Sequence, residues 1–138
     1  MAETFDVIVI GAGPAGTSAA LTAASAGLRV LVIERGEYVG AKNTSGGMLL
    51  AQVLQELVPD YHKEAPLQRP VEHHRIMMTS GERSLEIDFG NRGFLAPPFN
   101  GFTVLRQELD EWLANKARAA GAVIVTGTVV DDLLYEGD

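Results

Sequence analysis

The stretch FDVIVIGAGPAG, residues 5–16, decides the fold, and it is followed by an alanine-rich run and by LRVLVIE, residues 28–34. An almost continuous apolar run such as residues 7–10 is typical of a parallel strand that is buried on both faces. The pattern predicts that strand, a glycine turn, a helix that begins at Pro14, and a second strand that ends at the acidic residue Glu34.

The spacing of the glycines in this turn has a chemical meaning. Gly11 allows a tight turn out of the strand, Gly13 lacks the Cβ that would block a pyrophosphate, and Gly16 lets the helix lie close to the sheet. The N-terminus of the helix offers free N–H groups and partial positive charge to a diphosphate. A carboxylate at Glu34 can accept hydrogen bonds from ribose hydroxyls and would repel a 2′-phosphate, which disfavours NADP. The turn therefore predicts a dinucleotide site, and Glu34 alone does not distinguish FAD from NAD.

Length and composition exclude several classes of protein. A chain of 138 residues suggests one domain, and its net charge of −7 argues against a nucleic-acid surface and a basic membrane-binding patch. Without cysteine, the sequence forms no disulfide, thiolate nucleophile or cysteine-ligated iron–sulfur cluster of its own. The N-terminus has neither a signal peptide nor a membrane span, so we expect a cytoplasmic location, with any membrane association left to regions outside this sequence.

The middle of the chain is less regular. MLLAQVLQELVP, residues 48–59, has helical spacing, with Thr44 or Ser45 as N-cap. This helix start could bind a second anion or be an ordinary capped loop, and both interpretations stay open. Residues 60–71 are expected to form a polar linker, and residues 75–80 and 84–90 a β-hairpin. The aromatic side chains of the loop 91–101 are more typical of a core edge than of a substrate pocket.

The last third returns to the α/β pattern. We expect a strand over 102–105, a helix that ends near Gly121, a strand over 123–125 and a final strand over 128–134. The fold class is α/β: a Rossmann-like domain over 1–138 with a parallel sheet and an inserted hairpin at about 73–90. The turn signal at 136–138 lacks the strand that should follow it, so we expect a fragment of a longer protein, incomplete at its C-terminus.

Residues for catalysis or metal binding are not evident. His73 and His74 are adjacent on a strand, point to opposite faces and have no nearby carboxylate partner in the sequence, which makes a poor metal site. No Ser-His-Asp or Cys-His arrangement can be assembled. We therefore expect no metal and name no catalytic residue.

Four segments, namely GAGPAG with Glu34-Arg35, GAKNTSGG, LRQELDEWLANKARAAGA and GTVVDDL, occur in an order that resembles a known family. Together they are similar to the FAD-binding N-terminal part of flavoprotein oxidoreductases of the glutathione reductase-like superfamily. GAKNTSGGML looks most like the FixC-type dehydrogenases and their relatives, the electron-transfer flavoprotein–ubiquinone oxidoreductases and the geranylgeranyl reductases. The resemblance covers nearly the whole chain and implies FAD as the cofactor.

The resemblance also implies a role for each matching position. The implied FAD contacts are Gly11, Gly13, Ala15 and Gly16 at the pyrophosphate, Glu34 at the ribose of the AMP half, Arg35 beside the adenine, Ser45, Gly46 and Gly47 toward the ribityl-diphosphate and flavin, Arg106 at the diphosphate or ribitol, and Val130 with its backbone at the adenine.

The function implied by the resemblance is FAD-dependent electron transfer from an electron-transfer flavoprotein to a quinone or an iron–sulfur acceptor. The four-cysteine cluster of quinone-reducing relatives is absent, which is compatible with a separate ferredoxin-like partner. The Gly-Asp segment that grips the flavin in this superfamily, and the substrate domain, would lie beyond Asp138. Two alternatives stay open: a geranylgeranyl reductase-type enzyme and a non-catalytic nucleotide-binding module.

Overall fold

The computed structural model describes residues 3–135 and divides the chain into two compact units. Unit 1 consists of Met1–Ser45 and Arg106–Asp138, and unit 2 of Gly46–Leu105. The chain thus leaves unit 1 once and returns to it once, and each unit is described by itself.

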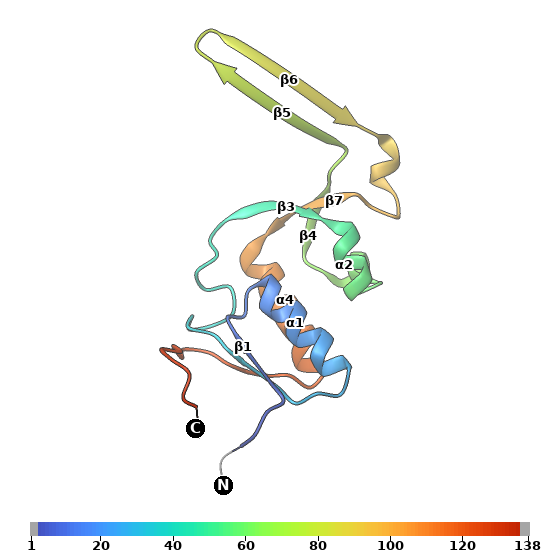
Figure 1. Ribbon diagram of the computed structural model, residues 1–138. Helices are drawn as coiled ribbons and strands as arrows, with labels where there is room; N and C mark the ends of the chain where they lie inside the picture. Colours follow the sequence, from blue (N-terminus) through green and yellow to red (C-terminus); the bar gives the residue numbers. More distant parts are fainter. Residues whose placement is uncertain (1–2, 136–138) are drawn as a thin grey trace. The chain divides into compact units, whose positions relative to one another are not determined.

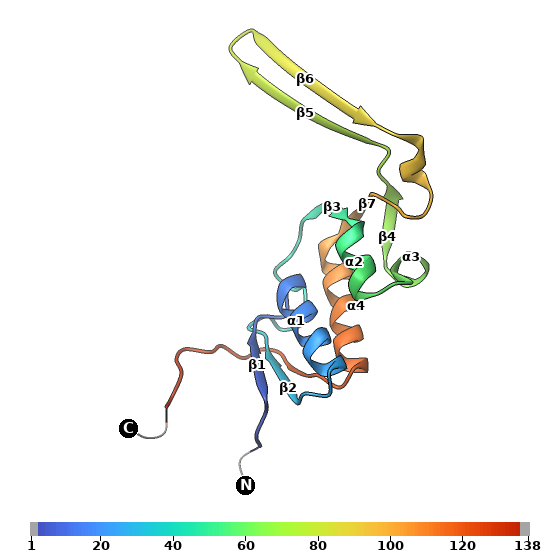
Figure 2. The same ribbon diagram turned by 45° about the vertical axis from the view of Figure 1, so that its right-hand side comes forward.

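Unit 1 is built on a three-stranded parallel sheet (Figures 1 and 2). Strand β1 (Val7–Ile10) is followed by helix α1 (Pro14–Ser25) and strand β2 (Val30–Ile33), and β2 pairs with both β1 and β8 (Val123–Val125). The parallel sheet with strand, glycine turn, helix and strand in succession confirms the predicted α/β class.

Two helices lie against one face of this sheet. Helix α1 packs beside helix α4 (Arg106–Ala119), as both ribbon views show (Figures 1 and 2). The side chains beneath them include Val30 and Val32, which are 1% and 0% exposed. The core of unit 1 therefore lies between the helices and this face of the sheet, and it holds α1 against the end of β1.

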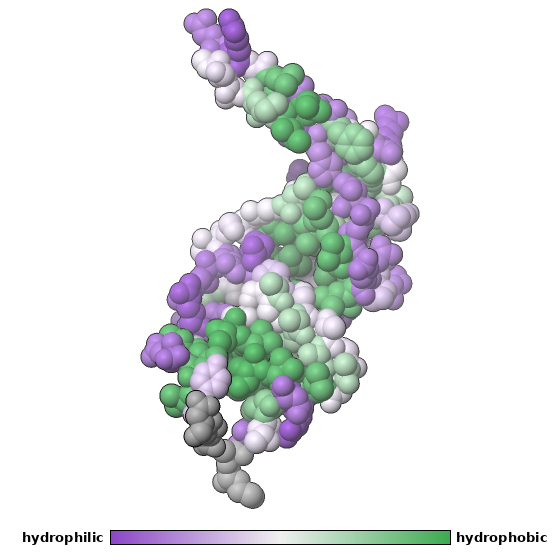
Figure 3. All heavy atoms as spheres, in the orientation of Figure 1, coloured by the Kyte–Doolittle hydropathy of each residue, from purple (hydrophilic) through white to green (hydrophobic). Residues whose placement is uncertain are grey.

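The opposite face of the sheet is open, which corrects the expectation that β1 is buried on both faces. Ile8 and Ile10 are 57% and 62% exposed, although both are aliphatic. The strand register places them in rows with β2 and β8. These rows are Ile8, Leu31 and Val123, and Ile10, Ile33 and Val125. Hydrophobic side chains gather over this part of unit 1 in the space-filling view (Figure 3).

Unit 2 contains an antiparallel sheet that the sequence did not predict. Its order is β3 (Gly46–Leu50), β7 (Gly101–Leu105) and β4 (Leu67–Pro70). The expected helix start with Thr44 or Ser45 as N-cap is wrong, because residues 46–50 pair with β7 and α2 (Ala51–Leu57) begins only after them. The expected linker over 60–71 instead forms the short helix α3 (Tyr61–Glu64) and β4.

The predicted hairpin forms from β5 (His73–Ser80) and β6 (Arg83–Gly90), and the 3₁₀ turn η1 (Arg92–Leu95) follows it. Its two faces differ in polarity, since His73, Arg75 and Asp88 bond on one face while apolar side chains line the other. The expectation that His73 has no carboxylate partner is wrong, because its Nδ1 lies 2.9 Å from Asp88 Oδ1. The apolar face consists of Ile76, Met78, Leu85, Ile87 and Phe89.

The expected final strand over 128–134 does not form. Residues 128–135 have no regular secondary structure, and Leu134 is 96% exposed. The Thr128 N–H donates to the Glu34 carbonyl at 3.0 Å, and the residues after it pair with no described strand. The turn signal at 136–138 lies outside the described residues.

A substitution at Gly16 tests how closely helix α1 packs on the turn. A Cβ built on Gly16 would overlap the Gly11 carbonyl oxygen and lie 3.1 Å from Val9 Cγ1. We expect Gly16→Ala to lower the free energy of unfolding by about 1–3 kcal/mol, because the helix must move away from the sheet. Urea denaturation measures this change. Gly13→Ala is the matched control, since its Cβ would meet nothing within 4 Å, and an equal loss in both variants would contradict the prediction.

Asp88 provides a test of the hairpin's polar face. The hydrogen bond from His73, and next that from Arg75, holds the pKa of Asp88 below its ordinary value of 3.8. A lowered carboxyl pKa means that these contacts stabilise the fold above pH 3.8, and that this contribution is lost as the pH falls through the lowered pKa.

We expect His73→Asn to raise the pKa of Asp88, as measured by a carboxyl-detected NMR titration. Arg83→Gln, which removes a cation from the same hairpin, is the control and should leave that pKa in place. An unchanged Asp88 pKa in His73→Asn would show that the histidine contact does not persist in solution.

Candidate functional site

The turn between β1 and α1 has the geometry that its glycines predict. Gly11 has a φ of +97°, a backbone conformation that side chains other than glycine rarely adopt. Its N–H donates to the Ile33 carbonyl at 2.8 Å, so the turn begins where β2 ends. The chain therefore passes directly from the carboxyl end of β1 into the first turn of α1.

The N-terminus of α1 is open to an acceptor. Gly13 is the N-cap and supplies no side-chain cap, and the first turn contains no acidic residue. Within residues 3–135, no acceptor bonds the amides of Ala15 and Gly16. Free N–H groups at a helix N-terminus, together with the helix dipole, favour a bound anion such as a diphosphate.

Neither backbone conformation nor packing requires glycine at position 13, although glycine is a suitable N-cap residue. Its φ of −73° and ψ of 178° are accessible to any residue. A Cβ built at this position would meet no atom within 4 Å. The absent side chain therefore leaves open space at the helix start, and this fits a group that must approach the backbone closely.

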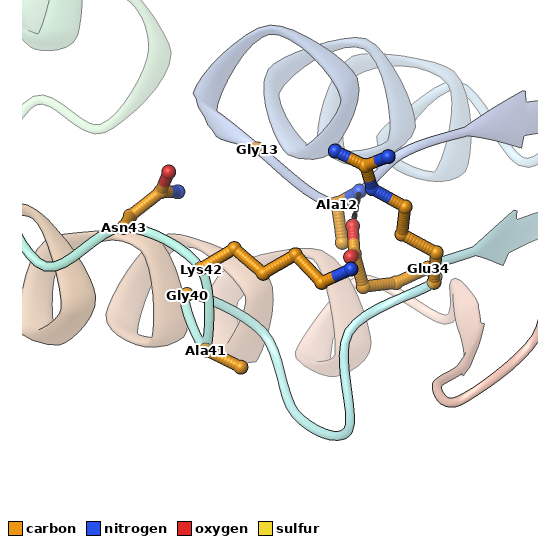
Figure 4. A pocket seen from close by; sticks show the side chains of 8 residues that line it. Ala12, Gly13, Glu34, Gly40, Ala41, Lys42 and Asn43 are labelled. Atoms are coloured by element: carbon orange, nitrogen blue, oxygen red, sulfur yellow. Dashed lines mark hydrogen bonds between the residues drawn. The ribbon is translucent and has the colours of Figure 1, made fainter.

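Glu34 lies at the end of β2 and faces the turn. Its Oε2 accepts the Ala12 N–H at 2.8 Å, drawn as a dashed line in Figure 4, and its Oε1 accepts the Gly36 N–H at 2.6 Å. A carboxylate has about four acceptor positions, so about two remain after these bonds. Glu34 thus fixes the turn and keeps acceptor positions that are available to hydroxyl groups of a ligand.

A pocket of about 190 Å³ lies between the turn and the segment after β2 (Figure 4). Three of the predicted site residues line it, and two of its lining residues are cations, Arg35 and Lys42. The lining residues are Ala12, Gly13, Glu34, Arg35, Gly40, Ala41, Lys42 and Asn43. The free amides of α1, the Glu34 carboxylate and these cations together match a nucleotide with a negatively charged diphosphate.

Arg106 and Ser45 come together in unit 1. Arg106 is the first residue of α4, and its N–H donates to the Ser45 carbonyl at 3.0 Å. Its guanidinium is not an isolated surface group, because Nε and Nη2 both donate to Asp110, each at 3.1 Å. Asp110 also accepts a hydrogen bond from the Asn43 side-chain amide.

The remaining predicted positions are more scattered. Gly46 and Gly47 lie on β3 in unit 2, where Gly47 pairs with Val104. Val130 is half-buried and lies in the irregular segment after β8. The cofactor roles of these three residues, like those of all the other predicted contacts, stay predictions.

Several residues of this site were missed by the sequence analysis. Lys42 and Asn43 belong to the GAKNTSGG stretch, but neither was given a role. Gly40 was also overlooked, although its φ is +85° and an added Cβ would lie 2.9 Å from the Gln107 carbonyl oxygen. The spacing of Arg106 and Asp110, four residues apart on one helix, was the signal that could have revealed their ion pair.

The described residues include neither a cluster of metal ligands nor a helix that could span a membrane. Within residues 3–135, no group of three or more His, Cys, Asp or Glu side chains could hold a metal ion. Across the same residues, no helix combines the length and the apolar character needed to cross a bilayer. The backbone N–H groups, the carboxylate and the cations around the turn suit a diphosphate and a ribose, and redox chemistry at such a site would come from a bound nucleotide.

Two curated relatives match nearly the whole chain. The chain is 43% identical over 137 residues to the protein FixC of Azotobacter vinelandii, which covers 99% of this chain and 32% of the relative. It is also 43% identical over 136 residues to the probable electron transfer flavoprotein-quinone oxidoreductase YdiS of Escherichia coli K12, again covering 99% and 32%. The chain therefore spans about a third of the length of the curated relatives it matches.

The fold is shared with solved flavoenzymes. A geranylgeranyl bacteriochlorophyll reductase-like protein from Thermoplasma acidophilum superposes with a TM-score of 0.72 at 31% identity, covering 91% of this chain and 30% of that one. The FAD-dependent halogenase CndH, a myxobacterial enzyme, superposes with a TM-score of 0.71 at 27% identity, covering 99% and 31%. Residues 6–138 match the family described as FAD dependent oxidoreductase, and the chain belongs to this family.

Proposed function

We propose that the turn and pocket of unit 1 hold the diphosphate and the AMP half of FAD. The observation that carries this proposal is the absence of a side chain at Gly13, which neither backbone conformation nor packing requires. A diphosphate that approaches the α1 N-terminus does require that missing side chain. The pocket with Glu34 lies beside this space, where the ribose of the same nucleotide would be bound.

The residues of unit 1 bind and orient the cofactor in this proposal. Gly11, Gly13, Ala15 and Gly16 hold the pyrophosphate through backbone N–H groups, while Glu34 accepts the ribose hydroxyls. Arg35 lies beside the adenine. Ser45 approaches the ribityl-diphosphate, and Arg106 donates to the diphosphate or ribitol with a charge-assisted hydrogen bond. Gly46 and Gly47 are proposed to contact the flavin side, and the Val130 backbone the adenine.

FAD supplies the redox chemistry when it is bound, and we name no acid or base of this chain as a participant. The proposed reaction of the whole protein is electron transfer from an electron-transfer flavoprotein to a quinone or to a ferredoxin-like iron–sulfur partner. The support is the 43% identity to FixC and to YdiS, the latter named as a probable electron transfer flavoprotein-quinone oxidoreductase. We propose a cytoplasmic location for this reaction.

A second candidate is a reductase of the geranylgeranyl type, which would act on isoprenoid double bonds. The support is the 31% identity and TM-score of 0.72 to the geranylgeranyl bacteriochlorophyll reductase-like protein. Both candidates use the same FAD site, so the residues of this chain described above do not separate them.

The two candidates differ in what exchanges electrons with the bound flavin. A rapid-mixing experiment with reduced electron-transfer flavoprotein should bleach the flavin absorbance if the first candidate holds. Re-oxidation of the reduced protein by an isoprenoid double bond, without any response to electron-transfer flavoprotein, would instead favour the second. A protein that stays colourless with added FAD would point to a non-catalytic nucleotide-binding module.

Gly13→Val tests the diphosphate contact. We expect FAD affinity to fall by about 100-fold or more, or about 2.8 kcal/mol, because the new side chain fills the space of the pyrophosphate. The melting temperature without FAD should fall only slightly, because valine is a poorer N-cap than glycine but meets no protein atoms in that space. Isothermal titration with FAD and thermal melting measure the two quantities. Ala19→Val is the control for a β-branched residue, at an exposed position of α1. Unchanged FAD affinity in Gly13→Val would show that the turn is only structural.

Glu34→Ala tests the ribose contact. We expect FAD binding to weaken by about 1–3 kcal/mol because a charged acceptor is lost. Stability should also fall, since the amides of Ala12 and Gly36 lose their acceptor. Glu37→Ala removes an exposed carboxylate three residues away and should bind FAD like the unaltered protein. If Glu34→Ala titrates like Glu37→Ala, the ribose contact lies elsewhere.

A further inference from the structure

Asp110 is a charged side chain that the proposed binding scheme leaves without a role. It lies on α4, where it is 0% exposed. Its Oδ1 and Oδ2 accept Nε and Nη2 of Arg106, each at 3.1 Å, and Oδ2 also accepts the side-chain amide of Asn43. A buried carboxylate is costly unless donors surround it, and these three donors come from two separate parts of the chain.

The first consequence concerns the segment Gly40–Asn43, which forms one wall of the pocket. Asn43 is bonded to Asp110 by its side chain, and its N–H donates to the Gly40 carbonyl at 2.8 Å. At the other end of the segment, Gly40 packs so closely on Gln107 that an added Cβ would lie 2.9 Å from that carbonyl oxygen. Both ends of the wall therefore rest on the first turns of α4, and Asp110 supplies the polar anchor.

The second consequence concerns the orientation of Arg106. Its guanidinium is planar and binds Asp110 along the edge formed by Nε and Nη2. Nη1 has no hydrogen-bond partner among residues 3–135, and the side chain is 33% exposed. One edge of the guanidinium is thus fixed by a buried partner, and both N–H groups of Nη1 remain available to bind an anion.

We propose that Asp110 is a positioning residue of the FAD site, which fixes the pocket wall 40–43 and the free edge of Arg106 before the cofactor arrives. This inference rests on the proposed FAD site and adds to it a residue that does not touch the cofactor. Donors that are already oriented gain more from a diphosphate, because their side-chain entropy has been lost during folding. One buried carboxylate therefore links two contacts to the same cofactor.

Asp110→Asn is the variant of choice because it keeps the shape of the side chain and removes its charge. We expect FAD affinity to fall by about tenfold or more, since small displacements of binding groups have effects of this size. Amide hydrogen exchange without FAD should become faster in residues 40–43. Glu108→Gln removes an exposed carboxylate from the same helix and should change neither quantity.

Asn43→Ala provides a second variant that leaves the ion pair between Arg106 and Asp110 intact. It should speed exchange in residues 40–43 and weaken FAD binding less than Asp110→Asn does. This variant keeps the proposal testable if Asp110→Asn fails to fold.

The outcomes separate the inference from the function on which it rests. Weaker FAD binding with faster exchange confined to residues 40–43 would support the positioning role. Lower stability with unchanged FAD affinity in both variants would overturn it and leave Asp110 a structural residue of α4. If the unaltered protein does not bind FAD, the proposed function fails and the inference fails with it.

Discussion

The carboxylate of Glu34 is the interaction on which the nucleotide site depends. It accepts the backbone N–H groups of Ala12 and Gly36, so it connects the turn after β1 with the segment after β2. These two segments form opposite sides of the pocket, and a shared acceptor fixes the space between them. Because the acceptor is charged, its bonds to backbone amides are stronger than those between neutral groups. A ligand that enters the pocket therefore meets a preformed acceptor with about two of its positions still free.

The groups around the turn are mainly positive, although the chain as a whole is negatively charged. A net charge of −7 would repel a diphosphate at long range. Close to the turn the balance is reversed, because the N-terminus of α1 is uncapped and the pocket is lined by Arg35 and Lys42. With a Debye length of about 8 Å at physiological ionic strength, these near groups decide the interaction more than distant carboxylates do. Recognition of the nucleotide is thus a property of the turn and its immediate neighbours.

The sequence predicted the features that depend on local patterns. The β1–turn–α1–β2 unit, α4 and the hairpin each have their own periodicity and turn residues, and all of them form. Residues 48–50 were expected to begin a helix because their spacing allowed it, but pairing with β7 overrides that preference. The segment 128–134 has strand-like residues, yet it pairs with no strand of the described residues. In the site, Gly13 and Glu34 follow a motif, whereas the bond between Asn43 and Asp110 joins distant residues with no common pattern.

The bond between the Arg106 amide and the Ser45 carbonyl has a topological consequence. It joins the two points at which the chain departs from unit 1 and re-enters it, and the adjoining residues Gly46 and Leu105 are partners in the β3–β7 pairing. An inserted segment whose two ends lie side by side adds little to the entropic cost of folding the rest of the chain. Excising residues 46–105 and joining Ser45 to Arg106 through a short bridge would thus keep the two parts of unit 1 connected, while it would remove the proposed contacts of Gly46 and Gly47. The same junction is a natural place at which such a module could accept a different insert.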